Sequence, residues 1–130
     1  MTKDQKFLRM YKVKQCLPKF HILYPNVESC TIIYTRIADG PGGNFSDPTP
    51  HTQRVNISED SSMVTVECLN QDCTEGYFYL DTVISDMVTH LETLRKDIMF
   101  CENGWQDEER RGVHRCLCKL EYEIQIKYKA

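Results

Sequence analysis

Residues 113–128 read Val-His-Arg-Cys-Leu-Cys-Lys-Leu-Glu-Tyr-Glu-Ile-Gln-Ile-Lys-Tyr, and this stretch decides the fold. Its side chains alternate between apolar and charged, which is the period of a β-strand with one buried face and one solvated face. The predicted buried face takes every second residue: Cys116, Cys118, Leu120, Tyr122, Ile124, Ile126 and Tyr128. We therefore expect an antiparallel sheet that buries one side of this strand.

Shorter segments predict the remaining elements. Runs rich in β-branched and aromatic residues predict strands over 20–24, 31–37, 54–57, 63–68 and 98–101. The first two strands are expected to form a hairpin. From Asp81 to about Lys96, apolar residues recur at helical spacing, and Asp81 is the expected N-cap. The predicted fold class is α+β: a mostly antiparallel β-sheet with one main helix.

The domain organisation follows from length and composition. A chain of 130 residues is expected to form a single domain, 1–130. Residues 1–38 are predicted to hold N-terminal strands and a basic arm, which carries six lysines and arginines before residue 20. Residues 39–52 contain three glycines and three prolines, which predict a flexible loop. Residues 53–130 are predicted to form a cysteine-rich, metal-binding core.

Charge and hydropathy exclude several classes of protein. The net charge of −3 argues against nucleic-acid binding without sequence specificity. No apolar run approaches the roughly 20 residues of a membrane span. Residues 1–6 are not followed by the apolar segment of a signal peptide, so we expect a cytoplasmic protein.

The seven cysteines predict a metal site, because clustered cysteines in a reducing compartment are more often metal ligands than disulfides. Cys68 and Cys73 have four residues between them, a spacing that suits a structural zinc knuckle. Cys101 ends an apolar run, and Cys116 begins the alternating strand. These four thiolates, Cys68, Cys73, Cys101 and Cys116, are the predicted ligands of one structural zinc ion.

The fourth ligand has two alternatives. Cys118 and His114 lie on the same predicted strand face as Cys116. Cys116 is preferred because it lies nearer the beginning of the strand, away from the apolar run that starts at Leu120.

Residues 63–128 resemble a zinc ribbon, in which two cysteine-bearing turns clamp one ion. The segments Cys-x4-Cys-Thr-x-Gly-Tyr-Phe from Cys68 and Cys-x2-Gly-Trp-Gln-Asp from Cys101 are also similar to segments of uncharacterised bacterial proteins. The resemblance implies a structural metal and no particular activity. The chain departs from the ribbon pattern because fourteen residues separate Cys101 from Cys116, and because a predicted helix lies between the two halves.

The sequence favours a binding protein over an enzyme. It contains no glycine-rich phosphate loop, His-Glu-x-x-His motif or Gly-x-Ser-x-Gly motif. Four thiolates would leave zinc no open position for a substrate. We therefore expect a non-enzymatic binding or adaptor domain, with a protein as its partner. The alternative is a thiol-based redox protein or a metal-dependent enzyme that uses the Cys68/Cys73 pair.

Overall fold

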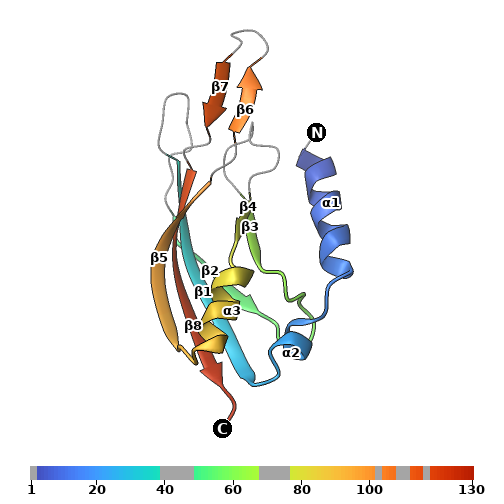
Figure 1. Cartoon of the computed structure of the whole chain (residues 1–130), viewed down its shortest axis with the longest axis vertical. Coiled ribbons are helices and arrows are strands. Elements are labelled where there is room, and N and C mark those ends of the chain that lie inside the picture. The colour runs from blue at the N-terminus through green and yellow to red at the C-terminus, as the bar shows by residue number, and fades with distance from the viewer. Residues whose placement is uncertain (1–2, 39–48, 68–76, 102–103, 108–111, 116–117) are drawn as a thin grey trace.

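The computed structural model describes residues 3–38, 49–67, 77–101, 104–107, 112–115 and 118–130 (Figure 1). The chain forms three helices and eight strands in these ranges. In chain order they are α1 (Lys3–Gln15), α2 (Phe20–Leu23), β1 (Val27–Ala38), β2 (His51–Val55), β3 (Thr65–Glu67), β4 (Tyr77–Tyr79), α3 (Asp81–Thr89), β5 (Leu94–Phe100), β6 (Gly104–Asp107), β7 (Gly112–Arg115) and β8 (Cys118–Tyr128).

The main sheet has the strand order β2-β1-β8-β5, and every neighbouring pair in it is antiparallel. The two longest strands, β1 and β8, lie side by side at its centre. They pair from Val27 opposite Tyr128 to Ala38 opposite Cys118. Two short pairs of strands, β3–β4 and β6–β7, form separate two-stranded sheets. The predicted α+β class with a mostly antiparallel sheet is thus confirmed.

The alternation of β8 is confirmed residue by residue. Its even-numbered residues lie on the inner face of the sheet and are buried: Cys118, Leu120, Tyr122, Ile124 and Ile126. The same core contains Phe20 of α2, Phe78 of β4, and Ile84 and Met87 of α3, all at most 1% exposed. One layer of helices and the β3–β4 hairpin therefore covers the inner face, because burying such side chains removes apolar area from water.

The prediction of a strand over residues 20–24 is wrong, because Phe20 begins the short helix α2. Phe20 and Tyr24 are buried, with ring centroids 4.8 Å apart, whereas Ile22 is 63% exposed. Burial at positions i and i+4 is the helical period, and a strand would have buried Ile22 as well. The expected hairpin with residues 31–37 therefore does not form, and β1 pairs with β2 and β8 instead.

The predicted helix from Asp81 to about Lys96 is too long. It ends at Thr89; Leu91 has a φ of 54°, and β5 begins at Leu94. Leu91 and Leu94 are 65% and 52% exposed, so the apolar stripe stops before them. Pairing of β5 with β8 overrides the helical spacing of these residues. Asp81 is the first helical residue and not the N-cap, which is Leu80.

The predicted loop 39–52 ends too late. His51 and Thr52 already belong to β2, where His51 pairs with Tyr34 of β1 and stacks on its ring at a centroid distance of 5.5 Å. This pairing explains why the strand starts before residue 54. Residues 39–48 lie outside the described residues.

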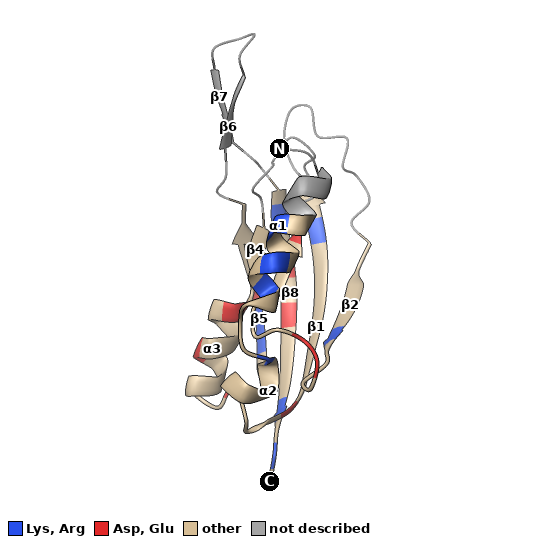
Figure 2. Ribbon diagram, turned by 90° about the vertical axis from the view of Figure 1, so that its right-hand side faces the viewer, with Lys and Arg blue, Asp and Glu red and all other residues tan. Residues whose placement is uncertain are grey.

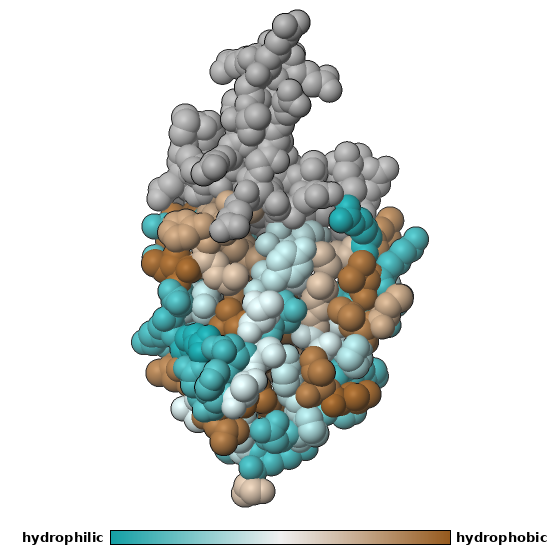
Figure 3. All heavy atoms as spheres, viewed as in Figure 1, coloured by the Kyte–Doolittle hydropathy of each residue, from teal (hydrophilic) through white to brown (hydrophobic). Residues whose placement is uncertain are grey.

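The N-terminal segment predicted as a basic arm contains the helix α1, Lys3–Gln15. In Figure 2, basic residues, drawn in blue, lie along the part of α1 that is not grey. Lys14 is half-buried, and burial lowers the pKa of its ammonium group while nearby Asp60 opposes that shift. On the face shown in Figure 3, apolar side chains occur in separate groups among hydrophilic ones. None of the described helices is long and apolar enough to cross a membrane.

Candidate metal centre at the cysteine end of the sheet

Cys101 and Cys118 lie opposite each other, one position beyond the last residue pair of β5 and β8. The backbone N–H of Cys101 donates to the carbonyl oxygen of Cys118 at 2.9 Å. This bond continues the register in which Phe100 pairs with Lys119. Both cysteines are buried, at 6% and 2% exposure. Because side chains of paired residues lie on the same face of a sheet, two buried thiols lie together where the inner face of the sheet ends.

The chain leading to Cys68 reaches the same end of the sheet. Arg36 of β1 donates through Nη1 to the carbonyl oxygen of Glu67 at 3.2 Å. Arg36 pairs with Leu120, two residues from Cys118, and Glu67 directly precedes Cys68. Glu67 also pairs with Tyr77. The two described residues that bracket segment 68–76 are therefore neighbours (Figure 1).

Three of the predicted ligands, Cys68, Cys73 and Cys116, lie outside the described residues. The predicted set of four thiolates therefore stays a prediction. Cys101 and the alternative ligand Cys118 are both described, and the structure brings these two together. His114, the other alternative, lies on β7 opposite Trp105 of β6.

Arg36 is a residue of this region that the sequence analysis did not single out. Its Nε is buried and has no hydrogen-bond partner among the described residues. The available signal was a lone cation in the otherwise uncharged strand segment 31–37, on the same face as Ile32 and Tyr34. Arg36 pairs with Leu120, two residues from Cys118, and its guanidinium donates to Glu67, so it belongs to this end of the sheet.

The two remaining described cysteines lie elsewhere. Cys30 is buried near the beginning of β1, and burial raises the pKa of its thiol to about 12. Cys30 is therefore a neutral core side chain at physiological pH. Cys16 is exposed and lies after the end of α1.

A second group of possible ligands is Asp86, His90 and Glu92, whose ligand atoms lie within 4.8 Å of one another. Arg95 of β5 already binds both carboxylates: it donates to Asp86 Oδ2 at 2.7 Å and to Glu92 Oε2. The hydrogen bond from Arg95 lowers the pKa of Asp86. A cation at this position would repel a metal ion, so the cluster ties α3 to β5 and is not a metal site.

The early end of α3 also decides the partners of Glu92 and Lys96. Their i, i+4 spacing would pair them if the helix continued past Thr89. Instead Glu92 pairs with Arg95, and Lys96 pairs with Glu123 across the sheet at 3.0 Å. The physical reason is the early end of α3. Residues four apart are neighbours on a helix, but in extended chain they are too far apart to pair.

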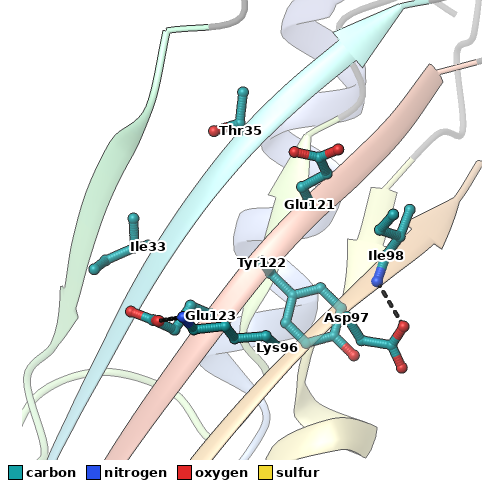
Figure 4. Close-up of a pocket in the computed structure, with 8 residues that line it drawn as sticks. All are labelled: Ile33, Thr35, Lys96, Asp97, Ile98, Glu121, Tyr122 and Glu123. Carbon is teal, nitrogen blue, oxygen red and sulfur yellow. Dashed lines mark hydrogen bonds and ion pairs between the residues drawn. The ribbon is translucent and has the colours of Figure 1, made fainter.

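The outer face of the sheet carries a shallow, open hollow of about 530 Å³ (Figure 4). Its floor holds the Lys96–Glu123 ion pair, and Asp97 at its rim accepts a hydrogen bond from the backbone N–H of Ile98. The eight lining residues are Ile33, Thr35, Lys96, Asp97, Ile98, Glu121, Tyr122 and Glu123. Lys96 and Glu123 neutralise each other in an open setting, which does not resemble a catalytic site.

Comparison with protein-family models, with curated proteins and with solved structures found no match.

Proposed function

We propose that this protein is a non-enzymatic binding or adaptor domain of the cytoplasm, stabilised by one structural zinc ion. The observation that carries the proposal is the buried, hydrogen-bonded pair Cys101 and Cys118. Two thiolates on one face at the end of a sheet supply half of a tetrahedral site. The ligands of the other half are Cys68, which directly follows Glu67, and Cys73.

The contact with Cys101 supports Cys118 as the fourth ligand in place of Cys116, which the sequence favoured. Cys118 is 2% exposed and is the direct register neighbour of Cys101. Cys116 is two residues earlier in the chain, and the same strand face would carry it further from Cys101. Both remain candidates that one experiment separates.

The role of zinc in this proposal is structural. Four thiolates fill the coordination shell of zinc and leave no position for water or substrate. The ion would join the end of β3 to the end of β5 and the beginning of β8. Its binding free energy would add to the free energy of folding. The guanidinium of Arg36 would offset part of the negative charge of the thiolates. A protein surface is the proposed partner, since the net charge of −3 disfavours nucleic acid.

The test is metal analysis of protein purified without chelator, together with single cysteine variants. We expect about one equivalent of zinc in the wild type, and loss of the metal with a lowered melting temperature in Cys101→Ser. Cys118→Ser should lose zinc and Cys116→Ser should keep it. Cys16→Ser is the matched control, because Cys16 is exposed and far from the site in sequence.

Two outcomes would contradict the proposal. Wild-type protein with less than about a tenth of an equivalent of any metal would exclude the site, since a closed thiolate site retains its ion. Rapid reaction of Cys68 and Cys73 with a thiol probe before chelation would favour the redox alternative, because metal-bound thiolates react only after the ion is removed.

A further inference from the structure

Strand β5 forms one edge of the main sheet, and the direction of its backbone groups can be assigned. Cys101 N–H donates to β8, and Thr93 C=O accepts from Ile126 N–H of β8. Backbone groups in an antiparallel strand point to alternate sides, so odd-numbered residues of β5 face β8. The N–H and C=O groups of Leu94, Lys96, Ile98 and Phe100 therefore point to the open edge, where the described residues place no further strand.

The same four residues present their side chains on the outer face of the sheet. Three of them are large and apolar: Leu94 is 52% exposed, Ile98 44% and Phe100 67%. An edge strand that combines outward backbone groups with exposed apolar side chains is a template for pairing with another strand.

Asp97 partly closes this edge. Its Oδ1 accepts the outward N–H of Ile98 at 2.8 Å, as the dashed line in Figure 4 shows. That N–H is the central donor of the open edge. A second strand has to displace the carboxylate before it can accept this hydrogen bond, and then has to accommodate a negative charge beside it. Charged residues on edge strands limit pairing in this way.

The side chains of β5 complement those of a second β5 in one antiparallel register. If Asp97 lay on the two-fold axis, the two Asp97 carboxylates would oppose each other at a Cα separation of roughly 4.5 Å, which is unfavourable. If Ile98 lies on the axis, Ile98 opposes its own copy and Lys96 opposes Phe100 of the second copy. A lysine beside an aromatic ring is an attractive pair.

We propose that the open edge of β5 is a pairing surface for β5 of a second copy of this chain, in the register centred on Ile98, and that Asp97 weakens this pairing. The partner is a second copy because this register brings apolar Ile98 onto its own copy and Lys96 beside the Phe100 ring of the second copy. Asp97 sets the affinity, since its carboxylate occupies the central donor of the edge.

The experiment compares self-association of the full chain by sedimentation, for the wild type, Asp97→Val and Asp97→Asn. Asp97→Val removes the acceptor and the charge, and we expect its dimer dissociation constant to fall at least about tenfold. Asp97→Asn removes the charge and keeps an acceptor oxygen, so a smaller decrease is expected. If Asp97→Val fails to fold, Asp97→Asn alone decides, and a dissociation constant equal to that of the wild type overturns the proposal.

Two controls separate edge pairing from other association. Ile98→Pro in the Asp97→Val background removes the outward N–H without removing a bond to β8, and it should reverse the gain in affinity. Glu121→Val on the central strand β8 also replaces an acidic residue by valine, but Glu121 lies away from the edge, and this substitution should leave the dissociation constant unchanged. Equal gains in Asp97→Val and Glu121→Val would overturn the proposal in favour of contact through the face.

Hydrogen exchange gives an independent measurement. In Asp97→Val, the amides of Lys96, Ile98 and Phe100 should exchange more slowly at high than at low protein concentration. Exchange of these amides that does not depend on concentration would overturn the proposal even if the variant dimerises.

Discussion

Arg36 and Glu67 are joined by a hydrogen bond of 3.2 Å from the guanidinium of one to the backbone carbonyl of the other. This contact connects the central strand β1 to the end of β3, one residue before Cys68. It links the main sheet to the short β3–β4 hairpin, which otherwise forms a sheet of its own.

Replacement of Arg36 by methionine should lower the free energy of unfolding by about 2 kcal/mol, because a charge-assisted and partly buried hydrogen bond is lost. Urea denaturation measures this change. Arg54→Met on the exposed strand β2 is the matched control and should change stability by less than about 0.5 kcal/mol. Equal effects of the two substitutions would show that the Arg36–Glu67 contact contributes nothing.

Asp86 should make stability depend on pH on the acid side. The hydrogen bond from Arg95 lowers its folded pKa below the unfolded value of 3.8. The ionised carboxylate of Asp86 therefore stabilises the folded state at pH values above its unfolded pKa. This stabilisation is lost as the pH falls through its folded pKa. Asp86→Asn should therefore melt at a lower temperature than the wild type at pH 7, and the difference should shrink toward pH 2. A difference that stays constant with pH would show that the ion pair is not responsible.

Cys30 should destabilise the fold at alkaline pH. Its pKa rises from 9.0 to about 12 through burial, so the folded state keeps the proton while the unfolded state loses it. The contribution of this neutral thiol is complete below pH 9 and is lost as the pH rises toward 12. Cys30→Ala should flatten that part of the stability curve. A thiol probe at pH 8 should modify Cys16 quickly and Cys30 only on unfolding.

Tyr128 should stabilise the turn that ends α3. Its hydroxyl group is the hydrogen-bond donor to two backbone carbonyl oxygens, that of Glu92 at 2.7 Å and that of Met87 at 3.2 Å. Tyr128→Phe should lower the free energy of unfolding by about 1 kcal/mol, because a partly buried carbonyl loses its donor. Tyr79→Phe removes the hydroxyl of a more exposed ring and serves as the control. Faster amide exchange at Leu91 and Glu92 in Tyr128→Phe would place the loss at this turn.

The spacing of apolar residues predicted an element correctly where one face of that element is buried along its whole length. The alternation of β8 is such a case, since Leu120, Ile124 and Ile126 are all buried in the order that the sequence implies. Leu94 was misassigned because its helical spacing to Ile84 and Met87 is real, yet pairing with Gln125 of β8 determines its conformation. Such pairing is non-local, and no window of neighbouring residues contains it.

The four-thiolate site stays a prediction, and the structure bears on one detail of it, the cysteine that lies opposite Cys101. The sequence favoured Cys116, at the beginning of the last strand. Which cysteine lies opposite Cys101 depends on the register between β5 and β8, and a shift by one residue would move each side chain to the other face. That register places Cys118 opposite Cys101, a fact that the spacing of the residues alone does not contain.

The central position of the β1–β8 pair has a consequence for synthesis on the ribosome. Val27 emerges early and Tyr128 late, yet the two strands form neighbouring rows of the sheet. Until residues 118–128 have left the exit tunnel, β1 lacks its main partner, β5 has nothing to pair with, and Ile32 and Val27 stay accessible to water. The fold therefore completes only after most of the chain is made.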